Sequence, residues 1–205
     1  MGAREATRTD VPRANYTTQS LLAVAVEVFN LRGYDGTSME DLAQACGITK
    51  SSIYHHVRSK EELLRLAVSR ALDMLNAVLE EAETREGRAI DRLEHMVRGS
   101  IRVVVEELPY VTLLLRVRGN TRAEQWALQR RREFDNRLSQ IVGEAAADGD
   151  LRDDLDPRLT TRLLFGMVNS MVEWYSPSRG GSSVDLADSV MRLALDGLRR
   201  RDPQG

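Results

Sequence analysis

The chain has 205 residues, enough for one large domain or for a small domain followed by a larger one. Hydrophobic residues make up 42% of it and aromatic residues only 5%, a composition that favours a helical globular protein over a β-rich one. The formal net charge of −2 excludes a strongly basic protein, so any binding to nucleic acid must rest on local charge.

Cysteine content and hydropathy indicate the cellular compartment in which the protein is expected. The single cysteine, Cys46, excludes an internal disulfide and is compatible with a reducing environment. No apolar run approaches the roughly 20 residues that span a bilayer, and the polar, aperiodic residues 1–15 lack the apolar core of a signal peptide. We therefore expect a cytoplasmic protein with no membrane partner, beginning with a flexible tail over 1–15.

The first predicted elements are two helices. Apolar residues recur at helical spacing over 17–32, and Gly33 ends the pattern. The segment from Thr37 to Glu40 matches a capping box, in which the Thr37 hydroxyl accepts from the Glu40 amide and the Glu40 side chain bonds in return. It predicts a short helix over 38–45.

A second short helix follows after a tight turn. Gly47 supplies a turn residue without a Cβ atom, and Thr49 is predicted to cap a helix over 50–57. Ile53 and Val57 share one face of that helix and are expected to pack on the two preceding helices. Two short helices joined in this way match a helix-turn-helix.

The opposite face of the predicted helix 50–57 is small, polar and free of acidic residues. Ser51 and His55 point away from the apolar face, Ser52 and Tyr54 flank it, and Lys50 lies in the first turn. Between residues 42 and 60 the charged residues are all basic. Such a face fits the major groove of duplex DNA, which is about 12 Å wide.

The rest of the chain is predicted to be helical as well. Capping signals, a proline at a helix start and a Gly-, Ser- and Pro-rich loop over 176–183 divide it into segments. The predicted helices span 60–83, 86–107, 109–117, 122–147, 157–175 and 184–200. The fold class predicted from these patterns is all-α.

At this point the sequence resembles the Tet repressor (TetR/AcrR) family of transcriptional regulators. The resemblance covers about 50 residues, from Thr17 to Leu66, and departs from the family pattern at Cys46 and Val57. It rests on Leu21-Leu22, Val28-Phe29, Gly33-Tyr34, Thr37-Ser38-Met39, Asp41-Leu42-Ala43, Ala45, the run from Gly47 to His56, and the run from Ser59 to Leu63.

The resemblance implies a domain organisation. A three-helix, helix-turn-helix DNA-binding domain would occupy 16–62, and a helical-bundle domain for ligand binding and dimerisation would occupy 63–205. It also implies a homodimer. Apolar residues crowd one side of the helices over 157–175 and 184–200, so these last two helices are predicted to form the dimer interface. The alternative is that both apolar stripes are buried within their own subunit.

The resemblance further implies roles for individual residues. Duplex DNA would be contacted at its phosphates by Thr37, Tyr54, His55 and Lys60, and at its base edges by Thr49, Lys50 and Ser51, with Ser52 beside them. Each has a structural alternative: the threonines can serve only as helix caps, Tyr54 as a core aromatic residue, and the lysines as solvated charges.

An arginine-rich region in the second part of the chain is the candidate ligand site. Arginines beside apolar runs at 113–121 and 130–134 can hold an anionic group next to an apolar cavity, and this region resembles regulators that respond to acyl-coenzyme A thioesters. The alternative is a solvated row of arginines paired with Glu124 and Glu133. The candidate ligand-binding residues are Arg116, Arg118, Trp126, Phe134, Met167, Met171 and Trp174.

Other functions find less support. Cys46 lies between small residues with no histidine or carboxylate placed to activate it, so a buried, inert thiol is expected. No spacing of histidine and cysteine predicts a metal site, and neither a cofactor nor an enzymatic activity is expected. The sequence therefore predicts a DNA-binding repressor released by a small effector. The alternative is an activator or architectural DNA-binding protein that needs no effector.

Overall fold

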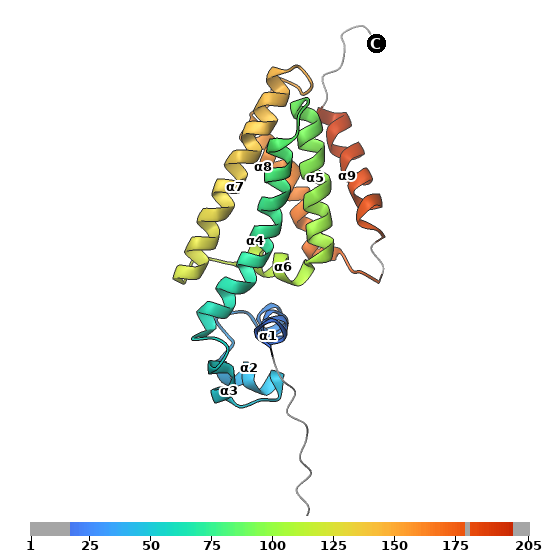
Figure 1. Ribbon diagram of the computed structural model, residues 1–205. Coiled ribbons are helices and arrows are strands. Elements are labelled where there is room, and N and C mark those ends of the chain that lie inside the picture. The colour runs from blue at the N-terminus through green and yellow to red at the C-terminus, as the bar shows by residue number, and fades with distance from the viewer. Residues whose placement is uncertain (1–16, 179–180, 199–205) are drawn as a thin grey trace, which may run out of the picture.

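The computed structural model describes residues 17–178 and 181–198, which form nine α-helices (Figure 1). They are α1 (Thr18–Arg32), α2 (Met39–Cys46), α3 (Lys50–Tyr54), α4 (Lys60–Thr84), α5 (Ala89–Glu106), α6 (Leu108–Arg116), α7 (Arg122–Ala147), α8 (Pro157–Trp174) and α9 (Ser183–Leu198). The all-α prediction is confirmed over this part of the chain. The predicted tail over 1–15 and the predicted last residues of the final helix lie outside the described residues.

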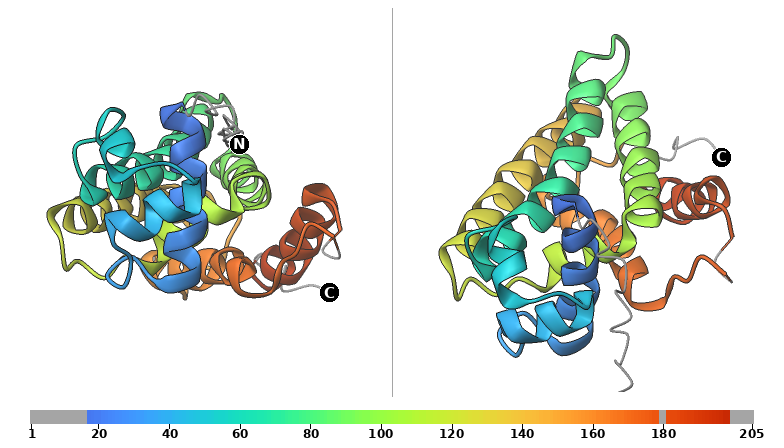
Figure 2. Two further views of the ribbon diagram at one scale, coloured as in Figure 1. Left: turned by 90° about the horizontal axis from the view of Figure 1, so that it is seen from below. Right: turned by 60° about the horizontal axis from the view of Figure 1, so that its bottom comes forward.

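Helices α1 to α3 form a small unit at one end of a helical bundle, and α4 continues from that unit into the bundle (Figures 1 and 2). Apolar side chains of α1, α2 and α3 pack together with the first turns of α4, because Phe29, Leu42, Ile53 and Leu63 are all buried in one continuous core. Burial of an apolar side chain of this size contributes about 1.5–3 kcal/mol. The apolar face predicted for the helix over 50–57 therefore packs on the preceding helices as expected.

The start of α2 differs from the prediction by one residue. Ser38 is the N-cap, its hydroxyl accepts from the Asp41 amide, and the Asp41 carboxylate accepts from the Ser38 backbone. The Thr37 hydroxyl instead donates to the Gly33 carbonyl at 2.7 Å. The capping box predicted for Thr37 and Glu40 is therefore wrong, because Ser38 and Asp41 offer the same spacing and Thr37 is taken into the core.

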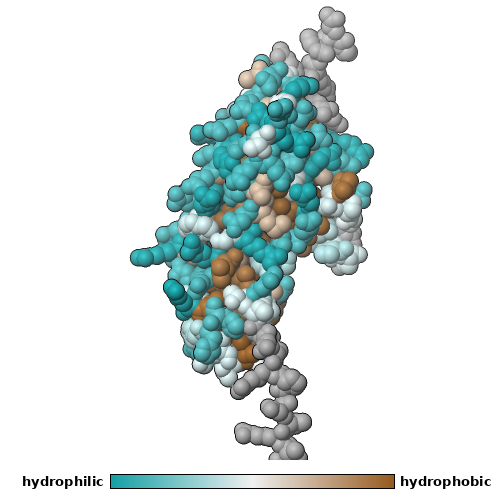
Figure 3. Space-filling model, viewed as in Figure 1, coloured by the Kyte–Doolittle hydropathy of each residue, from teal (hydrophilic) through white to brown (hydrophobic). Residues whose placement is uncertain are grey.

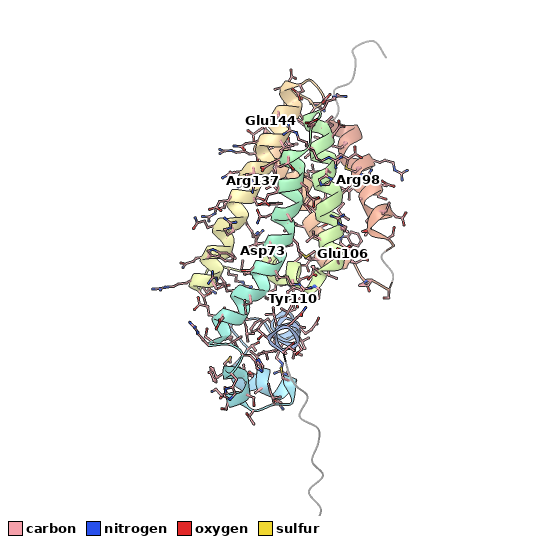
Figure 4. All side chains as sticks on the ribbon, viewed as in Figure 1. Asp73, Arg98, Glu106, Tyr110, Arg137 and Glu144 are labelled. Carbon is pink, nitrogen blue, oxygen red and sulfur yellow. The ribbon has the colours of Figure 1, made fainter. Side chains whose placement is uncertain are left out.

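Helices α4 to α9 make up the bundle, and two kinds of contact fix their positions. Gly99 of α5 lies so close to α4 that a Cβ atom there would be 2.2 Å from Val78 Cγ1. Ion pairs join other helices: Arg98 of α5 bonds Asp188 of α9 at 2.6 Å, and Arg137 of α7 bonds Glu83 of α4. Figure 4 labels both arginines. The visible surface is mostly hydrophilic, with smaller hydrophobic areas (Figure 3).

A partly buried ion pair ties α4 to the start of α6, next to the small N-terminal unit. Arg70 of α4 donates to both carboxylate oxygens of Glu107 at 2.7 and 2.6 Å, and its guanidinium lies 4.5 Å from the centre of the Tyr110 ring. Burial raises the pKa of Tyr110 above its ordinary value. This cluster holds the start of α6 against α4, between the N-terminal unit and the rest of the bundle. Tyr110 is labelled in Figure 4.

Candidate DNA interface and ligand cavity

The helix predicted over 50–57, which carries the face assigned to DNA, is shorter than expected. α3 ends at Tyr54, because the His55 amide bonds the Ser52 carbonyl, three residues back, and tightens the last turn. The Thr49 hydroxyl caps α3 by accepting from the Ser52 amide at 3.2 Å, and it also shares a hydrogen bond with the Ser52 hydroxyl. The predicted cap is confirmed, and Ser52 is held beside it, half-buried.

A polar face of α3 and its following turn is open to solvent. Thr49, Ser51 and His55 are exposed, and Tyr54 is 48% exposed, which excludes a core role for that ring. Ile53 on the opposite side is fully buried. The face that the sequence assigned to DNA is therefore available, on a short helix held from behind by its apolar side.

The local charge is less positive than the sequence suggested. Lys50 forms an ion pair with Glu40 of α2 across the turn, and the hydrogen bond from Lys50 lowers the pKa of the Glu40 carboxyl. Glu40 lies just outside the acid-free stretch in sequence but beside it in space. Duplex DNA would have to compete with Glu40 for the Lys50 ammonium.

Two of the residues predicted to contact phosphates have structural roles in the folded protein. The Thr37 side chain is only 2% exposed, so its hydroxyl cannot reach a phosphate in this conformation. Lys60 donates to the carbonyls of Tyr34 (2.9 Å) and Thr37 (2.8 Å), and its ammonium lies 4.3 Å from the centre of the Tyr34 ring. Lys60 thus fastens the loop between α1 and α2 to the start of α4.

A cavity of about 390 Å³ lies inside the bundle between α4, α5, α6, α7 and α8. Its volume falls in the range of small-molecule sites. Its apolar walls come from all five helices, and polar groups gather on α7 and α8. The apolar lining comprises Leu72, Leu75, Val104, Val111, Leu114, Leu115, Phe134, Phe165 and Val168.

Four arginines and one carboxylate also line this cavity. Arg131 and Arg132 come from α7, Arg158 and Arg162 from α8, and Asp135 lies one turn after Arg131. None of these arginines forms an ion pair within 4.0 Å with another described residue. Burial raises the pKa of the Asp135 carboxyl, although Arg131 and Arg162 act in the opposite direction.

Of the seven residues predicted to bind a ligand, only Phe134 lines this cavity. Met171 is buried in the core, whereas Met167 and Trp174 are exposed on the outer side of α8. Trp126 is half-buried, with the Arg65 guanidinium 5.4 Å from its ring centre. The predicted pocket roles of these four residues do not fit the structure, because sequence periodicity does not tell which side of α7 or α8 faces the cavity.

Arg116 and Arg118 line a different cavity, at the junction between α1, the loop after it, α6 and the start of α7. Arg116 donates to the Asn30 carbonyl at 3.1 Å, and the Glu124 carboxylate accepts from the Arg118 backbone amide at 3.0 Å. Of the ion pairs in the alternative interpretation, those between Glu124 and arginine side chains are not formed, whereas Arg130 pairs with Glu133 at 2.8 Å. The two cavities share Leu115 of α6.

The outer sides of α8 and α9 expose large apolar residues. On α8 they recur at intervals of about one turn, with Leu163 at 64% and Trp174 at 57% exposure. Exposed large apolar residues gathered on neighbouring helices are typical of interaction surfaces. The exposed apolar residues of the two helices are Leu159, Leu163, Met167, Trp174, Val184 and Leu193.

The next two observations concern only residues 17–178 and 181–198, which the structure describes. None of its helices combines the length and apolar content needed to cross a membrane. No cluster of three or more His, Cys, Asp or Glu side chains in it is placed to hold a metal ion. Cys46 is buried there, and burial raises the pKa of its thiol.

Comparisons with known proteins agree with this arrangement. A family described as "Bacterial regulatory proteins, tetR family" matches residues 21–67, and one described as "Tetracyclin repressor-like, C-terminal domain" matches residues 86–198. The transcriptional repressor KstR2 of Rhodococcus jostii (strain RHA1) is 30% identical over 194 residues, which cover 87% of this chain and 89% of the repressor.

Solved structures are similar over nearly the whole chain. The TetR-family regulator SCO3833 of Streptomyces coelicolor A3 is 59% identical with a TM-score of 0.83, covering 90% of this chain and 94% of that one. AibR, crystallised with isovaleryl coenzyme A and operator DNA, is 25% identical with a TM-score of 0.75, covering 87% and 97% of the two chains.

In this protein a three-helix unit exposes a polar helix, and it is joined to a helical domain that holds a cavity. This arrangement places the protein in the class of helix-turn-helix transcriptional regulators. The chain belongs to the TetR family.

Proposed function

We propose that the protein is a homodimeric repressor that binds a near-palindromic operator and is released by a small, largely apolar effector. The exposed polar face of α3 carries the proposal, because it is held rigidly by Ile53 and capped by Thr49. In a dimer, two such helices would enter major grooves about one helical turn (~34 Å), or a multiple of it, apart.

Residue roles follow from the exposed face. Thr49, Lys50 and Ser51 are proposed to contact base edges, whereas Tyr54 and His55 contact phosphates. Ser52 positions Thr49 through their shared hydrogen bond. The Lys50 ammonium would exchange Glu40 for a base edge or phosphate on binding.

The exposed apolar residues of α8 and α9 support dimerisation through these two helices. We expect Leu163→Arg to give a monomer in sedimentation experiments and to weaken operator binding, because a charge would be buried in the interface. Gln140→Arg places the same charge at an exposed position of α7 and serves as the control. An L163R variant that remains a dimer would exclude this interface.

The cavity in the bundle is proposed to hold the effector, for which an acyl-coenzyme A thioester is a candidate. Its support is the combination of apolar walls with unpaired arginines, and the relative AibR was crystallised with isovaleryl coenzyme A. Helix α4 connects the two sites, since Leu72 and Leu75 line the cavity and Lys60 holds the loop before α2. An effector shifts DNA affinity only if it binds the two forms unequally.

The test begins with genomic fragments selected for binding to the purified protein. Operator affinity is then measured with acyl-coenzyme A thioesters of increasing chain length and with coenzyme A alone as the control. A loss of operator affinity that requires the acyl chain supports the proposal. Operator affinity that stays unchanged with every acyl and apolar compound would favour the effector-independent alternative.

A further inference from the structure

The cavity contains a cation that its surroundings compensate only in part. Arg132, Arg158 and Arg162 are exposed, whereas Arg131 is half-buried. A guanidinium has five N–H donors, yet the structure gives the Arg131 side chain one hydrogen bond, a long one of 3.4 Å to the Leu114 carbonyl. Burial lowers the pKa of Arg131 below its ordinary value, although Asp135 acts in the opposite direction.

The one carboxylate in the cavity does not supply that partner. Asp135 lies one turn further along α7 but makes no ion pair within 4.0 Å and no hydrogen bond with Arg131. A half-buried guanidinium with a single long hydrogen bond has lost hydration that the protein does not replace, and this is unfavourable. Since the charge is kept, an anion from outside the chain is the natural counterion.

A second polar group in the cavity is also unsatisfied. Ser100 of α5 lines the cavity and is 2% exposed, and its Oγ atom has no hydrogen-bond partner. A buried hydroxyl without a partner costs about 1–3 kcal/mol. The cavity therefore presents a half-buried cation and a buried hydroxyl among apolar walls.

We propose that Arg131 is the residue through which the cavity recognises a compact anionic group of its ligand, with the Ser100 hydroxyl as a second polar contact. The ligand class is an amphipathic anion: an apolar body that carries a carboxylate, sulfonate or phosphate. This inference rests on the proposed function only in taking the cavity as the effector site. It concerns binding to the cavity and does not require the operator to be released.

Two fluorescent probes of nearly equal shape test the proposal on the full-length protein without DNA. Anilinonaphthalene sulfonate carries an anion, and N-phenylnaphthylamine has the same aromatic rings without it. Arg131→Met should weaken binding of the sulfonate probe about tenfold or more and leave binding of the neutral probe within about twofold. Ser100→Ala should cost the sulfonate probe about threefold.

Arg132→Met is the matched control, because Arg132 directly follows Arg131 on the same helix and lines the same cavity but is exposed. It should change binding of the sulfonate probe less than threefold. An Arg131→Met variant that loses both probes equally, or neither, overturns the proposal. If that variant does not fold, Arg131→Lys should keep the preference for the sulfonate probe and Arg131→Gln should lose it, and equal preference in both overturns the proposal.

Competition for the sulfonate probe separates the sources of the anion. Decanoate, decanoyl coenzyme A and the neutral decanol share an alkyl chain. Displacement by either anion at concentrations at least tenfold below those needed for decanol supports the proposal and identifies a free acid or a thioester as the better ligand. Equal displacement by decanol overturns it. An operator affinity that does not respond to a probe bound through Arg131 would count against the proposed function alone.

Discussion

Lys60→Met separates a structural role of Lys60 from a role in binding phosphate. The wild-type ammonium makes two hydrogen bonds to backbone carbonyls, at 2.9 and 2.8 Å, and lies over the Tyr34 ring. A hydrogen bond to a charged group contributes about 1.5–3 kcal/mol, and water replaces part of it because Lys60 is only half-buried. We therefore expect the variant to lose about 2–3 kcal/mol of unfolding free energy.

The assay pairs urea unfolding with the salt dependence of operator binding. Each phosphate contact that is lost lowers the slope of log K against log salt by about 0.9, whereas a purely structural lysine leaves the slope unchanged. Arg58→Met is the control, because it removes an exposed charge two residues away and should change stability by less than about 0.5 kcal/mol. A Lys60→Met variant with unchanged stability and a reduced slope would falsify the structural role and restore the phosphate contact.

Two further predictions concern the bundle. Gly99→Ala should reduce the unfolding free energy by about 1–3 kcal/mol despite the higher helix propensity of alanine, because its Cβ would lie 2.2 Å from Val78 Cγ1. Adding Val78→Ala should recover part of this loss, and strictly additive effects in urea unfolding would contradict the contact. The Arg137 hydrogen bond lowers the pKa of Glu83, so it stabilises the fold above the unfolded pKa, and this stabilisation disappears as pH falls through the lowered folded value. Arg137→Met should flatten that acid dependence, and an unchanged profile would exclude the pair.

Local signals in the sequence predicted the helices well. The glycines after α1 and α2 and the Thr49 cap act within one turn of chain, and the structure confirms them. The errors occurred where two local choices were nearly equal. Thr37 with Glu40 and Ser38 with Asp41 both fit a capping box, and the Thr37 hydroxyl was claimed by the Gly33 carbonyl.

Within the candidate DNA interface, the sequence predicted solvent exposure correctly for residues whose environment depends only on their own helix. Ser51, Tyr54 and His55 are exposed as their angular positions around the helix require. Lys50 and Lys60 differ because their partners come from other elements. Glu40, the partner of Lys50, belongs to α2, and the carbonyls that accept from Lys60 belong to the loop between α1 and α2. A count of charges along the chain cannot locate these partners.

The cavity shows the same limit more strongly, because its lining comes from five helices and depends on how each is rotated. Met167 and Met171 lie one turn apart on α8, yet Met167 is exposed and Met171 is buried. Their helix presents three sides to different surroundings: Arg158 and Arg162 to the cavity, Leu163 and Met167 to the outside, and Met171 to the core. A helix that is partly apolar on every side gives no single stripe from which to choose. Arginines could have marked the correct side, because a charged side chain on such a helix must face either solvent or a site that uses its charge.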